Sequence, residues 1–205
     1  MDEYHASVYR LIERTVGQEI YLLALHITPP TNYETATAIT RCGDSYTAHE
    51  IVVDGEKRSP FFRISYCESG AFGEQGTWQE SDDTKAFRPT HRSCPLPPSF
   101  AQRVARAWER MAFLRDTFGF PLCDGASTTL FTPSGRTISI WPTADDSEAA
   151  LLTTIEIEVA QYAMATTAVA ASQHLALLDA AISRLEGFLD QPVATGRREM
   201  RSHQS

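Results

Sequence analysis

The pattern of apolar and polar residues is clearest in the middle of the chain, where it predicts an amphipathic helix. Two prolines precede Ser99, which can cap a first turn, and Gln102 follows at the capping-box spacing. Gly119 and Pro121 are typical of the end of a helix. One helical face is apolar and carries Val104, Ala105, Trp108, Met111 and Ala112. We therefore expect this helix to be a structural spine that packs Trp108 into the core.

The first half of the chain predicts one helix followed by about four strands. Residues 2–16 repeat apolar positions at helical spacing, and Gly17 suits the position after a helix end. Residues 20–27 are almost continuously apolar, as in a central strand that is buried on both faces. Three further strands are predicted at residues 33–42, 46–53 and 61–67. The first of them is expected to be half-buried. Residues 68–94 lose all periodicity and are predicted to form a long loop.

The second half predicts a β-hairpin and a long helical region. Residues 128–132 and 136–141 alternate around Pro133-Ser134-Gly135, which suits a hairpin turn. Asp145 can cap the helix that follows, with Glu148 at the capping-box position. One apolar stripe is formed by Leu152, Ile155, Val159, Tyr162 and Val169. A second stripe, out of phase with the first, is formed by Leu178, Ile182, Leu185 and Leu189. The change of phase predicts a break near residues 166–172, although alternation over residues 155–159 leaves a strand open there.

These elements predict the α+β class, with an antiparallel β-meander and a β-hairpin packed against a central helix and one or two long C-terminal helices. No repeat or linker divides the chain, so we expect a single domain at residues 1–190. Residues 191–205 are polar and are predicted to form a tail.

Composition narrows the class of protein. The chain has 205 residues, 18 basic and 26 acidic, which gives a formal net charge of −8. Nucleic-acid binding needs a dominant basic surface, so no nucleic-acid partner is predicted. No stretch approaches the roughly 20 apolar residues of a membrane span, and the acidic N-terminus does not read as a signal peptide. These features favour a cytoplasmic protein without a membrane partner.

The charges are distributed in two blocks of opposite sign. Residues 68–83 hold five acids and no base, whereas residues 85–115 hold seven bases and one acid. The central helix contributes a basic stripe, which consists of Arg103, Arg106 and Arg110. The two blocks either neutralise each other, are separately solvated, or meet a charged partner. We expect the stripe to pair with the charges of the acidic loop, although it could also bind a phosphate or carboxylate group.

No linear motif predicts a catalytic, metal or cofactor site. The glycines of residues 70–76 have neither the spacing of a dinucleotide fingerprint nor the Lys-Ser/Thr of a P-loop. The four cysteines contain no CxxC pair, and we expect them to be reduced and partly buried. His26 is predicted to be a satisfied core histidine, and His49 is uninformative on a half-exposed strand.

Two cysteines leave alternatives open. His91 and Cys94 could supply two metal ligands, with Cys67 or Cys123 as a third, or act as a nucleophile pair. Cys123 beside Asp124 is a similar candidate. A ligand set needs at least three convergent groups and a catalytic triad is defined by geometry, so the sequence predicts neither.

In its size, acidity, poverty of motifs and helix–meander–helix–hairpin–helix order, the chain resembles immunity proteins of bacterial toxin systems. That resemblance implies a non-catalytic protein that neutralises a toxin by surface complementarity. Aromatic anchors surrounded by charge are typical of such contacts. The candidate contacts lie in the acidic loop and are Glu74, Trp78, Glu80, Asp82 and Asp83. The order is also similar to that of some acidic secretion chaperones, which dimerise, and a third alternative is an enzyme that uses Cys94 or Cys123.

Overall fold

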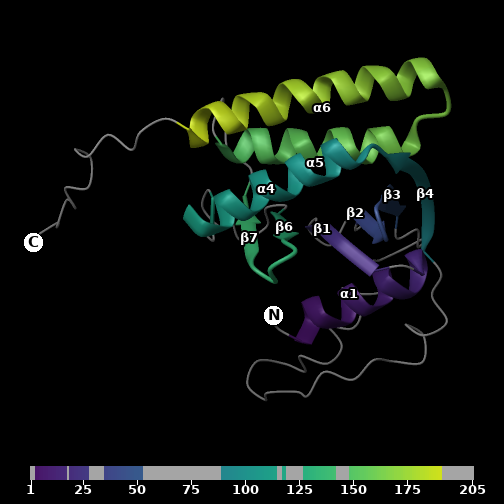
Figure 1. Ribbon diagram of the computed structural model, residues 1–205. Helices are drawn as coiled ribbons and strands as arrows, with labels where there is room; N and C mark the ends of the chain where they lie inside the picture. The colour runs from purple at the N-terminus through teal and green to yellow at the C-terminus, as the bar shows by residue number, and fades with distance from the viewer. Residues whose placement is uncertain are drawn as a thin grey trace, which may run out of the picture.

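The computed structural model describes residues 3–17, 19–27, 35–52, 89–114, 117–118, 127–141 and 148–190. The elements in chain order are α1 (Glu3–Val16), β1 (Glu19–Ile27), β2 (Thr35–Cys42), β3 (Ser45–Val52), β4 (Thr90–Leu96), α4 (Pro98–Leu114), β5 (Thr117–Phe118), β6 (Ser127–Phe131), β7 (Thr137–Ile140), α5 (Glu148–Met164) and α6 (Ala168–Leu189). They confirm the predicted α+β class, with its meander, hairpin and packed helices (Figure 1).

The strands form one sheet in the order β4-β3-β2-β1-β6-β7-β5. Each of the first five neighbouring pairs is antiparallel, and the two-residue β5 runs parallel to β7 at the far edge. Strand β1 is therefore the central strand, as its continuous apolar sequence predicts. A two-residue turn at Gly43 and Asp44 joins β2 to β3, and Gly43 has the positive φ of 59° that such a turn favours.

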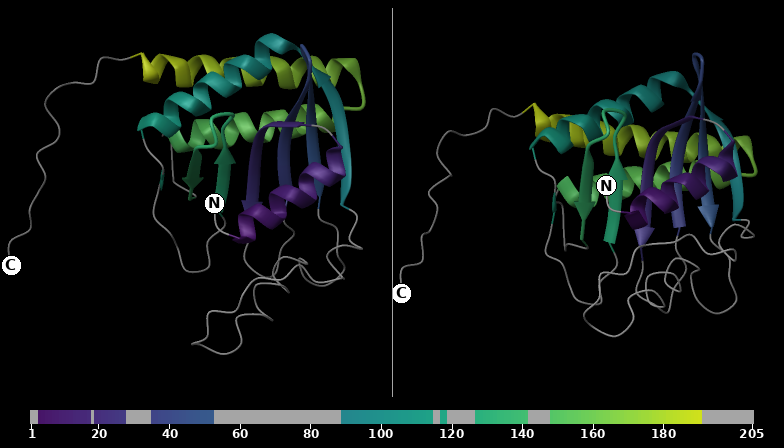
Figure 2. Two further views of the ribbon diagram at one scale, coloured as in Figure 1. Left: turned by 60° about the horizontal axis from the view of Figure 1, so that its bottom comes forward. Right: turned by 90° about the horizontal axis from the view of Figure 1, so that it is seen from below.

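Helices cover both faces of this sheet. Alternate residues of β1 point to opposite sides: Leu22 and Ala24 join a core with α4, α5 and α6, whereas Leu23 and Leu25 join a core with Ile12 of α1. Helices α4, α5 and α6 run across the strands on one side, and α1 lies on the other (Figure 2). This second layer also corrects the prediction for β2, which is buried on both faces over residues 36–40 rather than half-buried.

The fourth strand of the meander is β4 at Thr90–Leu96, inside the segment predicted as a loop. That prediction is wrong from residue 90 onward, because β4 is an edge strand and edge strands need no apolar alternation. Pro95 fits there, since an edge strand has one side free of ladder hydrogen bonds. The strand predicted at residues 61–67 lies outside the described residues.

Helix α4 confirms the predicted spine but not its ends. Trp108 is 2% exposed in the core. The helix begins at Pro98 rather than after a Ser99 cap, and the carbonyl of Pro97 accepts hydrogen bonds from the first amides. It ends at Leu114 instead of at Gly119, because residues 117 and 118 leave the helix and pair with β7.

The second half follows the predicted order. In the β6–β7 turn the amide of Thr132 donates to the carbonyl of Arg136, and Gly135 has a φ of 80°. The predicted break separates α5 from α6, and Thr167 caps α6 by accepting from the amide of Ala170. The alternative strand at residues 155–159 is excluded, because those residues are helical. Val169 was predicted to belong to the first apolar stripe, but it lies in α6 and is exposed.

Candidate protein-binding site

The contacts predicted from the acidic loop cannot be placed. Glu74, Trp78, Glu80, Asp82 and Asp83 lie outside the described residues, so this set of contacts stays a prediction.

The basic stripe of α4 faces α6. The guanidinium of Arg103 forms ion pairs with Asp179 and with Glu186, the latter at 2.9 Å, and it donates to the hydroxyl of Ser183 at 3.0 Å. These three partners lie on one side of α6, at spacings of three and four residues. The expectation that the stripe pairs with the acidic loop is therefore wrong for Arg103, whose acidic partners come from α6.

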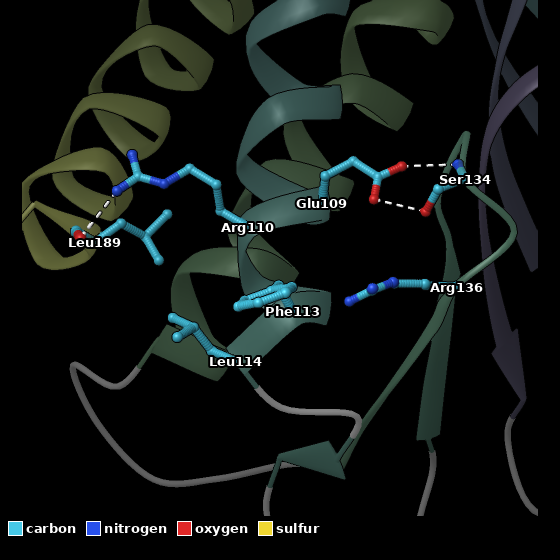
Figure 3. A pocket seen from close by; sticks show the side chains of 7 residues that line it. All are labelled: Glu109, Arg110, Phe113, Leu114, Ser134, Arg136 and Leu189. Carbon is cyan, nitrogen blue, oxygen red and sulfur yellow. Dashed lines mark hydrogen bonds between the residues drawn. The ribbon is translucent and has the colours of Figure 1, made fainter.

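Arg110 makes a similar contact near the C-terminal ends of both helices. Its Nη2 donates to the carboxylate of Asp190 at 2.7 Å. It also donates to the carbonyl of Leu189 at 2.9 Å, the bond drawn in Figure 3. The second bond uses a backbone carbonyl at the end of α6, where the helix itself supplies no donor. Arg103 and Arg110 thus fasten α6 along α4, whereas Arg106 is exposed.

A groove of about 440 Å³ lies where α4, α6 and the β6–β7 turn meet. It is lined by Glu109, Arg110, Phe113, Leu114, Ser134, Arg136 and Leu189 (Figure 3). Its volume falls within the usual range for binding pockets, toward the lower end. The residues come from three elements that share the main core, so the groove has a fixed frame.

The floor of the groove is apolar and open. Phe113 is 75% exposed and Leu114 is 57% exposed, at the point where the last turn of α4 passes the edge of the core. Leu189 approaches from α6, on the side of the Phe113 ring away from Arg136 (Figure 3). A cluster of large apolar side chains at the surface is typical of a contact site.

The polar residues of the groove hold its wall together. One carboxylate oxygen of Glu109 accepts from the amide of Ser134 at 2.7 Å, and the other accepts from its hydroxyl at 2.7 Å. This fork ties the hairpin turn to α4. From the same turn, Arg136 places its guanidinium over the ring of Phe113, 5.2 Å from the centroid. The exposed aromatic ring is therefore in contact with a cation on a neighbouring element.

A second polar cluster is buried between the sheet and α5. The hydroxyl of Thr37 donates to Glu156 at 2.9 Å and lies 3.4 Å from Glu50. Burial raises the pKa of Glu50 to about 7, with repulsion from Glu156 as the second cause. Burial also raises the pKa of Glu156. With exposed fractions of 9% and 7%, these carboxyls lie beneath α5 rather than in an open site.

The candidate histidines lie in the sheet. Nδ1 of His26 lies 2.9 Å from the hydroxyl of Thr128, which confirms a hydrogen-bonded histidine, but the residue is half-buried rather than in the core. His49 is buried, which corrects the half-exposed strand expected there. Its Nε2 lies 2.9 Å from the hydroxyl of Thr40, and burial lowers its pKa to about 4, with a smaller effect from His91. An imidazole in that state is neutral at physiological pH.

The structure does not bring together His91 and Cys94, the pair left open as an alternative. The two residues are three positions apart on β4, so their side chains point to opposite faces of the sheet. His91 lies near His49, with ring centroids 5.9 Å apart, whereas Cys94 packs against the core with α5. Cys67 and Cys123 lie outside the described residues. Within the described ranges, no three His, Cys, Asp or Glu residues are grouped to hold a metal ion.

The fold and the groove together describe an α+β protein with a sheet covered on both faces and an exposed apolar groove at one end of its helical layer. No family model, curated protein or solved structure matches the chain. None of the helices in the described part of the chain is both long and apolar enough to cross a membrane.

Proposed function

We propose that this chain is a non-catalytic binding protein that neutralises a cognate bacterial toxin by forming a complex with it. The observation that carries the proposal is the groove, which presents Phe113 and Leu114 beside Arg136 on a fixed frame. Aromatic and arginine side chains are the commonest hot spots of protein interfaces. A contact surface that is already ordered loses little conformational entropy when its partner binds.

The chemistry of the groove favours binding over catalysis. Among the described residues that line it there is no histidine or cysteine. The hydroxyl of Ser134 donates to Glu109 at an exposed turn, and that carboxylate also accepts the amide of the same residue. Glu109 is therefore engaged in holding the turn, which is a positioning role.

The proposal is tested with the products of the neighbouring genes. Each product is co-expressed with the tagged full-length protein, and complexes are isolated by affinity purification. We expect one product to copurify, to arrest growth when it is expressed alone, and to be harmless in the presence of this protein. If no neighbouring product forms a stable complex, the proposal fails.

The groove is then tested by substitution. Phe113→Ala should weaken the complex at least tenfold, because the ring is the largest exposed anchor of the groove. Ile157→Ala is the matched control, since it removes an exposed apolar side chain (46%) of α5 that does not line the groove. Equal affinities of the two variants would place the contact elsewhere, with the acidic-loop residues such as Trp78 as the next candidates. Protection should survive replacement of Cys94 and Cys123 by serine, whereas a cysteine-dependent enzyme would lose activity.

A secretion chaperone or adaptor for an exported effector is the second candidate. It is favoured by the outer side of α6, where Val169, Leu177 and Phe188 are exposed. The acidic chaperones that this order resembles dimerise, and a second copy could cover such residues. Sedimentation equilibrium separates the two candidates: a stable dimer that binds an unfolded effector segment supports the chaperone, and a monomer that binds a folded domain supports the inhibitor.

A further inference from the structure

The charged residues of the groove are not equally available to a partner. Both carboxylate oxygens of Glu109 accept hydrogen bonds from Ser134, and Arg110 is paired with Asp190. Arg136 is exposed, and in the described part of the chain its contact is the ring of Phe113 rather than a carboxylate. The charge that the groove can offer is therefore the guanidinium of Arg136.

The position of this guanidinium favours one kind of ligand. The central carbon of the guanidinium lies 5.2 Å from the centroid of the Phe113 ring, and no carboxylate of the described residues accepts from its N–H donors. Those donors form a fork that matches the two oxygens of a carboxylate. The contact with Phe113 places the guanidinium beside the apolar surface of the groove, so a carboxylate that binds it lies next to that surface.

The floor of the groove adds a second requirement. Phe113, Leu114 and Leu189 present apolar surface next to Arg136 (Figure 3). A ligand with only charge would leave that surface in water, whereas an apolar side chain would bury it. The volume of about 440 Å³ exceeds that of a single side chain, so a short stretch of extended chain also fits.

We propose that the groove binds a segment of the partner protein in which a large apolar side chain lies next to aspartate or glutamate. The apolar side chain packs on Phe113 and Leu114, and the carboxylate accepts from Arg136. This inference rests on the proposed function for the identity of the partner as a protein. It predicts an acidic contact on the partner, in contrast to the basic surface that the acidic loop would meet.

The probes are fluorescein-labelled ten-residue peptides with a central phenylalanine flanked by aspartates, by asparagines or by lysines. Binding to the full-length protein is followed by fluorescence polarisation. We expect the aspartate peptide to bind at least tenfold more tightly than the asparagine peptide, and the lysine peptide more weakly still. The preference for aspartate over asparagine should disappear in Arg136→Gln and persist in Arg106→Gln, which removes the same charge from an exposed residue outside the groove. Phe113→Ala should weaken binding of the aspartate peptide and of the asparagine peptide.

Several results would overturn the inference. These are the absence of binding by any peptide at 1 mM, an equal affinity for the three peptides, or an unchanged preference in Arg136→Gln. A fourth peptide with the sequence of residues 191–205 tests whether the chain's own tail is the occupant, and tighter binding of that peptide would also overturn it. The two proposals can fail separately. If a toxin complex forms and Arg136→Gln does not weaken it, the proposed function stands and the inference about the groove fails. If the peptides bind as expected but no toxin complex forms, the inference about the groove stands and the proposed function fails.

Discussion

Two polar interfaces involve the helical layer, one between two of its helices and one between the layer and the sheet, and they follow opposite rules. Between α4 and α6, Arg103 meets the carboxylates of Asp179 and Glu186 at the surface. Between the sheet and α5, Glu50 and Glu156 meet beneath the helix and share the hydroxyl of Thr37. The first interface joins opposite charges that are partly exposed to water, and the second places two carboxyl groups together away from it.

The two interfaces differ because burial removes water from a charged group and makes its ionised form less favourable. An exposed ion pair keeps most of its hydration, so forming it changes the free energy little. A buried carboxylate loses its hydration, and a second carboxylate nearby makes ionisation still less favourable. The pKa of about 7 for Glu50 follows from these two causes. The α4–α6 contact should therefore be nearly indifferent to pH near neutrality, whereas the α5–sheet contact should depend on it.

The largest expected effect tests whether α5 is held by packing rather than by its acids. Ile155 precedes Glu156 on α5 and is fully buried, so Ile155→Ala should lower the free energy of unfolding by about 2–5 kcal/mol. Urea denaturation followed by circular dichroism measures this change. Ile157→Ala, on the exposed side of the same helix, should change it by less than about 1 kcal/mol. A loss of unfolding free energy in Ile155→Ala as small as that in Ile157→Ala would show that apolar packing does not anchor α5.

The next effect is the pH dependence of the buried acids. Glu50 is protonated in both states below about pH 4.5 and ionises in the unfolded chain as the pH rises above that value. The folded protein retains the proton until about pH 7, so stability falls across this interval. At about 1.4 kcal/mol per pH unit, the loss is on the order of 3 kcal/mol by pH 8. Glu50→Gln should remove it, and urea unfolding of both proteins from pH 4.5 to 8 measures the difference.

The control for this profile is Glu13→Gln, which neutralises an exposed carboxylate on α1. This variant keeps the buried Glu50 carboxyl, so its unfolding free energy should still fall between pH 4.5 and 8. The interpretation is wrong if the difference between wild type and Glu50→Gln is constant from pH 4.5 to 8, since a constant difference would not reflect titration of the buried carboxyl.

The elements that sequence patterns predicted well are those in which local periodicity and burial agree. The run at residues 20–27 is apolar because β1 is central, and Leu178, Ile182 and Leu185 repeat at helical spacing because one side of α6 is buried. β4 was missed because an edge strand with Pro95 has no such pattern. The cluster of Thr37, Glu50 and Glu156 could not be predicted, because two of its members are 119 positions apart and meet only through the packing of α5 on the sheet.

The groove gave one sequence signal that was not recognised. Ala112, Phe113 and Leu114 are three consecutive apolar residues on a helix, so they cannot all face the same core. Met111 and its face are buried, which leaves Phe113 and Leu114 at the surface. That argument identifies exposed apolar residues, but it cannot identify Arg136, since the hairpin meets α4 only in the folded chain.

The smallest expected effect concerns the exposed interface. Arg103→Ala should lower the free energy of unfolding by about 1 kcal/mol at low ionic strength, because it removes two ion pairs that stay in contact with water. The loss should shrink in 1 M NaCl, where the Debye length is about 3 Å. Urea is the suitable denaturant, since guanidinium chloride would itself screen the charges. Arg106→Ala removes an exposed arginine of the same helix and should have less effect at either salt concentration. A loss above about 3 kcal/mol that salt leaves unchanged would mean that Arg103 is effectively buried, and the two interfaces would then follow the same rule.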